Sequence, residues 1–434
     1  MKLASNMTTN SEGILTIAKV KVTDLAQEYG TPLYVYDEAL LKSTALSFLN
    51  AFQSNVFKTK IIYASKASSF IALLHLYQTL GLAVDVVSEG ELYTALKAGV
   101  SPENIVFHGN NKLDEELMMA IDSGVRTIVL DNFDEAKRLS RISEAKNKVI
   151  SVLLRVNPGV EAHTHDYIKT ATSDSKFGLG IKNGVALEYL KAIHQLPFLQ
   201  LKGIHSHIGS QIFSSQSFIE ASKILLDFVE TCKENGLDIS ILNLGGGFGV
   251  YYTEEDSPFD IPEFLKKLSS ILEEELSTRK LQLEEIWLEP GRSLVNESGT
   301  TLYEIGDIKK IENEVNYAFV NGGMGDNLRV SLYGAKYEAV IANRLNEKPQ
   351  TLWRVAGKYC ESGDILLKDI PLVEPQKGDI LAVLRTGAYT FSMFSNYNRL
   401  RRPAVVFVSN GTSRLVVKRE SLDDLIALDM EESK

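Results

Sequence analysis

A repeated alternation of short apolar runs and helical patterns dominates the chain between Asp37 and about Thr300. The apolar runs are rich in β-branched residues and almost continuous, as expected of parallel strands that are buried on both faces. Amphipathic segments such as residues 133–147 and 216–236 separate them, and their spacing predicts helices. The expected strands are residues 61–65, 83–88, 105–109, 127–131, 150–157, 201–209, 239–247 and 284–291.

Eight strand–helix units predict an α/β fold in which a (β/α)8 barrel of the TIM type is the main body. A doubly wound open sheet is the alternative arrangement of the same units. The number of units favours the closed barrel, and so does a phosphate-type glycine loop at residues 245–247, after the seventh run.

The rhythm of the sequence changes after about Thr300, where short alternating β runs replace the strand–helix units. Asn410 and Gly411 stand between two such runs and are a typical two-residue hairpin turn. We therefore expect a C-terminal all-β domain, and we assign to it a strand-like segment that precedes the barrel. The predicted domains are a barrel at residues 37–298 and a β domain formed by residues 1–36 and 299–434.

The net charge of −10 argues against a nucleic-acid-binding surface and does not favour an anionic membrane as partner. An anionic ligand would then be held by local arginines and backbone amides. The two cysteines, Cys232 and Cys360, are far apart in the sequence and do not suggest a disulfide framework. No apolar run is long enough for a signal peptide or a membrane span. These features predict a cytoplasmic protein.

Barrel enzymes carry their active sites at the C-terminal ends of the strands, and chemically useful groups fall at three such ends. Lys66 directly follows the first run; a lysine there is usually solvated, but its amine is also suited to form an imine with a carbonyl. The glycines at 245–247 end the seventh run, where bare backbone amides can approach a phosphate, although glycines more often serve turns. Glu289 ends the eighth run, where it either pairs with Arg292 or keeps a pyridine nitrogen protonated.

Two pairs of closely spaced histidines raise the question of a metal site. His205 and His207 end the sixth run, and His163 and His165 form the second pair. We take these two side chains to point to opposite faces of the strand, so His205 and His207 are not expected to face one site together. Metal-dependent barrel hydrolases also need further ligands at other strand ends. We therefore expect no metal, and an imidazole at His207 that stacks on a flat cofactor.

The β half carries a second group of reactive side chains. Cys360 begins the glycine-containing loop CESGD at residues 360–364, which also carries Glu361 and Asp364. A lone cysteine is usually a buried small hydrophobe. Here its thiol could donate a proton to a carbanion, and the carboxylates could hold ammonium groups. Arg329 suits the bidentate capture of a carboxylate.

Taken in order, these motifs resemble those of the fold-type III pyridoxal phosphate (PLP)-dependent decarboxylases. The resemblance runs from about residue 32 to residue 403 and is strongest to the members that act on diaminopimelate. It implies a barrel plus a C-terminal β domain, as in alanine racemase and ornithine decarboxylase, and a head-to-tail homodimer with active sites at its interface. The main motifs are YASKAS around Lys66, HIGSQ at 207–211, LGGGFG at 244–249, EPGRS at 289–293 and CESGD at 360–364.

The resemblance implies a role for each matching residue. Lys66 would hold PLP as an imine, Glu289 would pair with the pyridine nitrogen, His207 would stack on the ring, and Cys360 would be the proton donor. The expected cofactor-binding residues are Lys66, Asp85, Arg155, His207, Ser210, Gly245, Gly246, Gly247, Glu289, Pro290, Gly291, Arg292 and Tyr389. The expected substrate-binding residues are Arg292, Arg329, Tyr333, Glu361 and Tyr389.

The implied activity is decarboxylation of meso-2,6-diaminopimelate to L-lysine and CO2, the last step of lysine biosynthesis. Alanine racemases share the lysine and the barrel but place an arginine at the pyridine nitrogen, so Glu289 favours decarboxylation. Ornithine decarboxylases bind a distal amine and need only an acid there, whereas Arg329 with Glu361 suits a distal end that bears both a carboxylate and an ammonium. Arginine and carboxynorspermidine decarboxylases are further alternatives, as is a non-catalytic cofactor-binding relative. The presence of both Lys66 and Cys360 disfavours the last.

Overall fold

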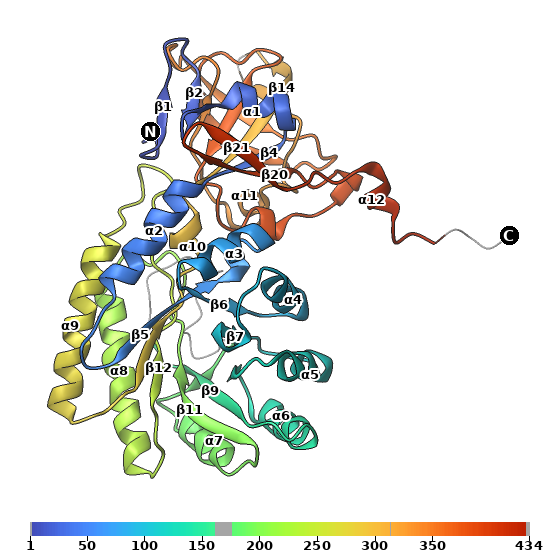
Figure 1. Cartoon of the computed structure of the whole chain (residues 1–434). Helices are drawn as coiled ribbons and strands as arrows, with labels where there is room; N and C mark the ends of the chain where they lie inside the picture. The colour runs from blue at the N-terminus through green and yellow to red at the C-terminus, as the bar shows by residue number, and fades with distance from the viewer. Residues whose placement is uncertain (1, 161–175, 313, 431–434) are drawn as a thin grey trace. The chain divides into compact units, whose positions relative to one another are not determined.

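The computed structural model describes residues 2–160, 176–312 and 314–430. The chain forms two compact units (Figure 1). The barrel unit comprises residues 44–250 and 257–294, and the β unit comprises residues 1–43, 251–256 and 295–434. The histidine pair at 163 and 165 lies outside the described residues.

Eight parallel strands close into a ring in the barrel unit, which confirms the predicted fold class. Neighbouring strands pair in parallel around the ring, and β13 pairs with β5 to close it. A short strand, β10 (Leu179–Gly180), adds to the end of β9. The ring consists of β5 (Lys58–Ala64), β6 (Ala83–Val86), β7 (Ile105–Phe107), β8 (Thr127–Leu130), β9 (Ile150–Asn157), β11 (Leu199–His205), β12 (Ile241–Asn243) and β13 (Glu285–Leu288).

Three barrel strands end three or four residues earlier than the apolar runs predict. β11 ends at His205, β12 at Asn243 and β13 at Leu288, although the corresponding runs extend to residues 209, 247 and 291. Glycines explain part of the difference, because Gly245 (φ 68°) and Gly247 (φ 110°) adopt backbone conformations that a strand does not allow. The residues predicted for the site therefore lie in loops that directly follow the strands.

Helices flank the strands on the outside of the barrel (Figure 1). Three of them begin at a residue whose side chain accepts a backbone N–H of the first turn, namely Ser88, Asn132 and Asp260. Of the helices in the described ranges, none combines the length and the apolar character that a membrane crossing requires. The helices are α2 (Glu38–Ala51), which begins in the β unit, α3 (Ile71–Thr79), α4 (Glu89–Lys97), α5 (Asp114–Ser123), α6 (Phe133–Ala145), α7 (Val185–His194), α8 (Ser215–Glu234), α9 (Ile261–Arg279) and α10 (Arg292–Val295).

The core of the barrel is a cluster of buried apolar side chains that come from different strands. This packing removes apolar surface from water and holds the strand ends in a constant relation to one another. The cluster consists of Ile62, Ala83, Val106, Val129, Leu153, Ile241 and Trp287.

The β unit is built on a sheet with the strand order β18-β17-β15-β14-β4-β20-β21, to which β19 and β16 are attached through β14. A separate three-stranded sheet precedes it in the chain. The strands are β1 (Met7–Thr9), β2 (Leu15–Ile17), β3 (Val20–Lys21), β4 (Leu33–Asp37), β14 (Gly299–Lys310), β15 (Asn316–Val320), β16 (Ala339–Ile341), β17 (Thr351–Ala356), β18 (Ile365–Leu372), β19 (Ile380–Leu384), β20 (Ala404–Ser409) and β21 (Thr412–Val417). The helices are α1 (Val22–Tyr29), α11 (Leu328–Tyr333) and α12 (Leu422–Ile426).

The N-terminal strand β4 lies inside this sheet, antiparallel to β14 and parallel to β20. Leu33 and Val35 belong to the buried apolar cluster of the unit. Tyr34 and Tyr36 lie at the alternate positions, and their hydroxyls donate to the carbonyls of Asp326 (2.6 Å) and Gly387 (2.8 Å). Because side chains alternate along a strand, one face of β4 packs into the apolar cluster and the tyrosines of the other face form hydrogen bonds.

The predicted hairpin is confirmed, because β20 and β21 pair antiparallel on either side of residues 410 and 411. Both turn residues have positive φ, 49° at Asn410 and 85° at Gly411. Such a turn matches the right-handed twist of the two strands that it joins.

Candidate active site

Lys66 lies at the C-terminal end of β5, in a single helical turn formed by Ser65–Ala67. Its side chain is exposed, whereas Ser65 and Ala67 on either side are buried. The Tyr63 hydroxyl donates to the carbonyl of Ser68 at 2.9 Å and so fixes the turn from inside the barrel unit. The amine is therefore presented at the barrel end from a rigid base.

Glu289, directly after β13, is a buried carboxylate that is surrounded by hydrogen-bond donors. The Nε2 of His108 lies 2.8 Å from Oε1, and the Nδ2 of Asn243 donates to the same oxygen at 2.7 Å. The Nε2 of His205 lies 3.1 Å from Oε2, although it is not aligned as a regular hydrogen bond. Burial alone would raise the pKa of Glu289, but His108 and His205 hold it well below its usual value. The carboxylate is therefore ionised.

The glycine loop after β12 has no room for side chains. A Cβ on Gly245 would lie 2.4 Å from the carbonyl oxygen of Ser206, and a Cβ on Gly246 would lie 2.1 Å from that of Glu289. A Cβ on Gly247 would lie 2.1 Å from the carbonyl oxygen of Gly209. The loops after three neighbouring strands thus pack backbone against backbone, with no side chain between them.

Two further groups of the expected phosphate site are brought together. The Nη2 of Arg292, at the start of α10, donates to the Oγ of Ser210 at 3.0 Å. Ser210 follows β11 and Arg292 follows β13, so the contact joins the same loops as the glycines do. A guanidinium, a hydroxyl and a glycine-rich backbone are the donors that bind a phosphate.

The barrel end also contains Asp85, Arg155 and His207. Burial raises the pKa of Asp85 to about 7, despite the nearby His108 and Lys66. Burial also lowers the pKa of Arg155, and it lowers that of His207 well below its usual value, where the cations of Lys66 and Arg155 act in the same direction. The neutral His207 ring accepts from the N–H of Gly246, at 3.4 Å to Nδ1.

The sequence argument that separated His205 from His207 is wrong for this barrel. Residues two apart in a strand point to the same face, so the strand period gave no reason to separate them. His205 contacts Glu289, and His207 is affected electrostatically by both His205 and Glu289. Both imidazoles therefore belong to one site.

In the β unit, Arg329 lies on α11 and is buried. The Nη1 of Arg329 donates to the Tyr337 hydroxyl, and the guanidinium lies over the ring of Tyr252 with its carbon 4.7 Å from the centroid. Burial would lower the pKa of Arg329, but Tyr252 and Tyr337 raise it above its usual value. Among the described residues, no carboxylate lies within ion-pair distance of Arg329.

The CESGD loop is exposed at its first residues and buried at its last residue, Asp364. Cys360 and Glu361 are exposed, and the Cys360 N–H donates to Oδ1 of Asn398 at 2.8 Å. Asp364 is buried, and its two oxygens accept the N–H groups of Met324 (2.6 Å) and Tyr359 (2.8 Å). The expectation that both carboxylates hold ammonium groups is therefore wrong for Asp364, which anchors the loop.

Two tyrosines of the β unit were also expected at the site. Tyr333 ends α11 and is exposed by 38%. Tyr389 is half-buried and has a φ of 59°, a left-handed conformation that is unusual for a residue with a side chain. Tyr389 acts electrostatically on Arg329, so these two residues of the β unit are neighbours.

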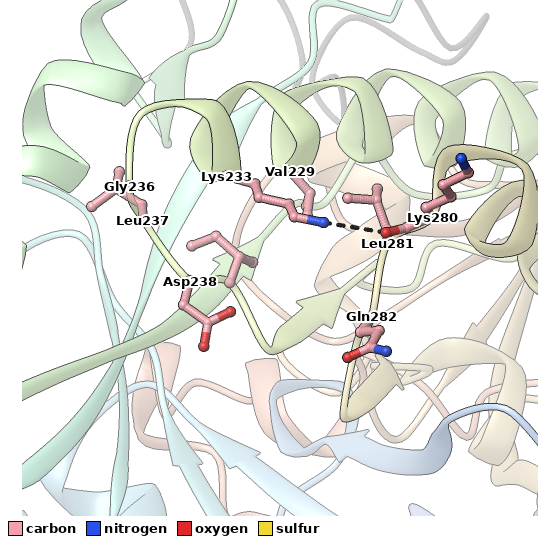
Figure 2. Close-up of a pocket in the computed structure, with 9 residues that line it drawn as sticks. Val229, Lys233, Gly236, Leu237, Asp238, Lys280, Leu281 and Gln282 are labelled. Atoms are coloured by element: carbon pink, nitrogen blue, oxygen red, sulfur yellow. Dashed lines mark hydrogen bonds between the residues drawn. The ribbon is translucent and has the colours of Figure 1, made fainter.

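A hollow of about 430 Å³ lies at the other end of the barrel, before β12 and β13 begin. Figure 2 shows that it is bordered by the end of α8 and by the loops that lead into these strands, and that the Lys233 ammonium donates to the carbonyl of Lys280. None of the residues predicted for the site lines it. The hollow is therefore not a candidate for the chemistry.

Comparisons with known proteins agree with this geometry. Residues 42–296 match the family model of the pyridoxal-dependent decarboxylase, pyridoxal binding domain. The diaminopimelate decarboxylases of Halalkalibacterium halodurans and Bacillus subtilis are each 49% identical to this chain over 422 residues, which cover 97% of this chain and 96% of theirs. The chain belongs to the diaminopimelate decarboxylase family. A crystal structure of diaminopimelate decarboxylase from M. jannaschii in co-complex with L-lysine has a TM-score of 0.90 and 32% identity, and 98% of both chains is covered.

The cofactor of this family is PLP, and the barrel end fits it. The backbone of the glycine loop forms a cradle that any Cβ would fill, with Arg292 and Ser210 beside it. Lys66 offers an amine for the aldehyde, and Glu289 offers an ionised carboxylate for the ring nitrogen. The donor set therefore matches the phosphate, the carbonyl and the pyridine of PLP.

Sequence reasoning missed two members of the diaminopimelate decarboxylase site, His108 and Asn243. Both are polar residues at the end of an otherwise apolar predicted strand, in IVFHG and ILNLG. A polar residue at the C-terminal end of a barrel strand was the signal that could have identified them.

Proposed function

We propose that this chain catalyses the PLP-dependent decarboxylation of meso-2,6-diaminopimelate to L-lysine and CO2, the final step of lysine synthesis. The observation that carries the proposal is the buried Glu289 carboxylate, which is held ionised at the same barrel end as Lys66 and the glycine loop. An ionised carboxylate stabilises a protonated pyridine nitrogen, as carbanion chemistry requires. An arginine at this position would disfavour that protonation.

Within this proposal, the residues of the barrel end bind and orient the cofactor. Lys66 would hold the cofactor through its aldehyde, and Glu289 would hold the proton on the ring nitrogen. The phosphate is held by Ser210, Arg292, Tyr389 and the backbone at Gly245, Gly246, Gly247, Pro290 and Gly291. His207 packs against the ring, and Asp85 and Arg155 complete its surroundings. The bound cofactor supplies the conjugated system that accepts the electron pair left behind when CO2 departs.

The residues of the β unit bind the substrate and complete the reaction. Arg329, which has no carboxylate partner in the described part of the chain, pairs with the distal carboxylate of the substrate. Glu361, together with Tyr333, binds the distal ammonium. Arg292 and Tyr389 also contact the substrate. The Cys360 thiol then gives its proton to the carbon that has lost CO2, which yields L-lysine.

The proposed activity is tested with a panel of amino acids supplied to the PLP-loaded protein. We expect CO2 release and stoichiometric L-lysine from meso-diaminopimelate, because only this substrate offers both a carboxylate and an ammonium at its distal end. Ornithine, arginine and lysine should give a kcat/KM lower by on the order of a hundredfold, which corresponds to about 3 kcal/mol of lost transition-state binding. A preference for ornithine or arginine would contradict the substrate assignment, and no CO2 from any of them would contradict the decarboxylase assignment.

We further propose that the active form is a cytoplasmic homodimer in which each site takes its proton donor from the partner. Cys360 is exposed in the single chain, as a group that serves another protomer must be. A free thiol as proton donor also suits a reducing compartment, and Cys232 is buried and unpaired as well. The head-to-tail arrangement follows from the family resemblance.

The shared site predicts complementation between two inactive variants. Lys66→Ala and Cys360→Ala are each expected to be inactive, but their mixed dimer has one site with both residues intact. Statistical mixing should return about a quarter of the wild-type activity, since half of the dimers then carry one good site. The heterodimer purified through two different tags should show about half of the wild-type activity, because one of its two sites is intact.

A matched control pairs Lys66→Ala with Glu289→Gln, because both residues belong to the same barrel unit. In that mixed dimer neither barrel is intact, so activity should not rise above the residual activity of Glu289→Gln. Equal activity of the two mixed dimers, or none in the first, would contradict a proton donor supplied by the partner.

A further inference from the structure

Glu289 poses a physical problem that the cofactor alone does not solve. Its carboxylate is only 7% exposed, and an ionised carboxylate in such a place is costly unless donors satisfy both oxygens. A cationic partner would satisfy them, but it would also cancel the charge that a protonated ring nitrogen needs. The site therefore requires donors that stabilise the carboxylate without neutralising it.

His108 and His205 are such donors. They follow or end two strands, β7 and β11, and their ring centroids are 4.8 Å apart at an interplanar angle of 74°. The Nε2 of His108 is hydrogen-bonded to Oε1 of Glu289 at 2.8 Å, whereas the Nε2 of His205 lies 3.1 Å from Oε2 without regular hydrogen-bond alignment. Burial lowers the pKa of His205 to about 4, so its ring is neutral and offers an N–H without a positive charge. The neutral His205 ring and His108 thus place imidazole nitrogens at both oxygens of the carboxylate.

Asn243 supplies the third donor, and it also links Glu289 to the glycine loop. Its Nδ2 donates to Oε1 of Glu289 at 2.7 Å, while its Oδ1 accepts the N–H of Gly245 at 2.9 Å. The Glu289 N–H in turn donates to the carbonyl of Gly245 at 2.7 Å. Glu289 is therefore linked to Gly245 in two ways, through Asn243 and through its own backbone N–H. These links fix the distance between the carboxylate that faces the ring nitrogen and the loop that binds the phosphate.

Other charged groups face the same carboxylate but cannot replace these donors. Asp85 on β6 and Arg155 on β9 act on Glu289 and on each other electrostatically, and Lys66 acts on Asp85. The structure shows no hydrogen bond from Lys66 or Arg155 to Glu289 among the described contacts. The two imidazoles and the amide are the groups that touch it.

We propose that His108, His205 and Asn243 are positioning residues that keep Glu289 ionised and in register with the glycine loop. This inference rests on the proposed function, because it assigns Glu289 to the ring nitrogen of PLP. The three residues act through Glu289 and do not touch the reacting atoms.

The test compares His108→Leu and His205→Leu with His108→Gln and His205→Gln, because glutamine retains an N–H near the position of Nε2 whereas leucine does not. PLP labelled with nitrogen-15 in the ring is bound to each variant, and the NMR shift of that nitrogen reports whether it carries a proton. We expect a protonated nitrogen in the wild type and in the glutamine variants, and loss of that proton in the leucine variants. The kcat of the leucine variants should fall by on the order of tenfold with KM little changed, and glutamine should restore most of it.

Two further variants separate positioning from general damage. His194→Leu, on the exposed end of α7, is the matched histidine control and should change neither the nitrogen signal nor kcat. In a Glu289→Gln background, His108→Leu should cause no further loss, because its effect passes through the carboxylate that is already absent. An additive loss in the double variant would overturn the inference even if the leucine variant folds poorly.

Two results would contradict the inference directly. The first is a nitrogen that stays protonated, with unchanged kcat, in both leucine variants. The second is a stoichiometric metal ion in the purified wild type that is lost in His108→Gln, since the ligand atoms of His108, His205 and Glu289 lie within 4.8 Å of one another. If the wild type binds PLP with a protonated nitrogen but releases no CO2 from diaminopimelate, the proposed function fails while the positioning role stands.

Discussion

Replacing Lys66 with alanine is expected to remove both the characteristic absorbance of the bound cofactor and nearly all turnover. The amine stands on a turn that is fixed by the hydrogen bond from Tyr63 to Ser68, directly after β5. No other group of the turn can form a covalent bond with an aldehyde. We expect kcat to fall by on the order of a thousandfold or more, because covalent binding of the cofactor by the amine is lost.

The matched control is Lys58→Ala, which removes an exposed lysine from the other end of the same strand. Borohydride treatment followed by peptide mass spectrometry should fix the cofactor to Lys66 in the wild type and in Lys58→Ala. Circular dichroism should show that Lys66→Ala retains its fold. A Lys66→Ala protein that keeps its absorbance and turnover would disprove the assignment.

Arg329→Ala is expected to cause the second large loss, and the loss should be selective. Arg329 is a buried guanidinium that is held by tyrosines and has no carboxylate partner in the described ranges of the chain. A bidentate pair with a substrate carboxylate is worth about 1.5–3 kcal/mol, so kcat/KM for diaminopimelate should fall by roughly ten- to a hundredfold or more. Arg329→Lys should recover only part of this, because an ammonium keeps the charge but not the planar fork.

The selectivity of the loss distinguishes substrate binding from structural damage. Lysine lacks the distal carboxylate, so any slow reaction with lysine should not decline in parallel. The absorbance of bound PLP should persist, because Arg329 is not assigned to the cofactor. Arg354→Ala is the control, since Arg354 pairs with Asp369 at the surface of the same unit. Equal losses for both substrates would show that Arg329 serves the structure of the β unit.

Local sequence patterns determined the fold class and the location of several site residues at the strand ends. The eight apolar runs, the glycine loop and the change to alternating β runs each depend on neighbouring residues, so they can be identified without tertiary contacts. The rule that barrel sites form at the C-terminal ends of strands then identified Lys66, Gly245 and Glu289 as residues of one site. Family resemblance added the expected cofactor and substrate.

Only the tertiary structure decided which side chains meet at that site. His108, His205 and Asn243 come from three different strands, and their contacts with Glu289 depend on how far each strand extends before its loop begins. The sequence did not show that β11 stops at His205. The argument that separated the two histidines failed because residues two apart in a strand share a face.

The same limit explains the loop around Cys360. Its two carboxylates look equivalent in the sequence, but Asp364 is buried and satisfied by two backbone N–H groups, whereas Glu361 is exposed. The sequence thus showed that two carboxylates lie close to Cys360, but not which of them is buried. Its burial, its partners and hence its ionisation were decided by the packing of segments far apart in sequence, because desolvation and hydrogen bonding depend on all neighbours in space.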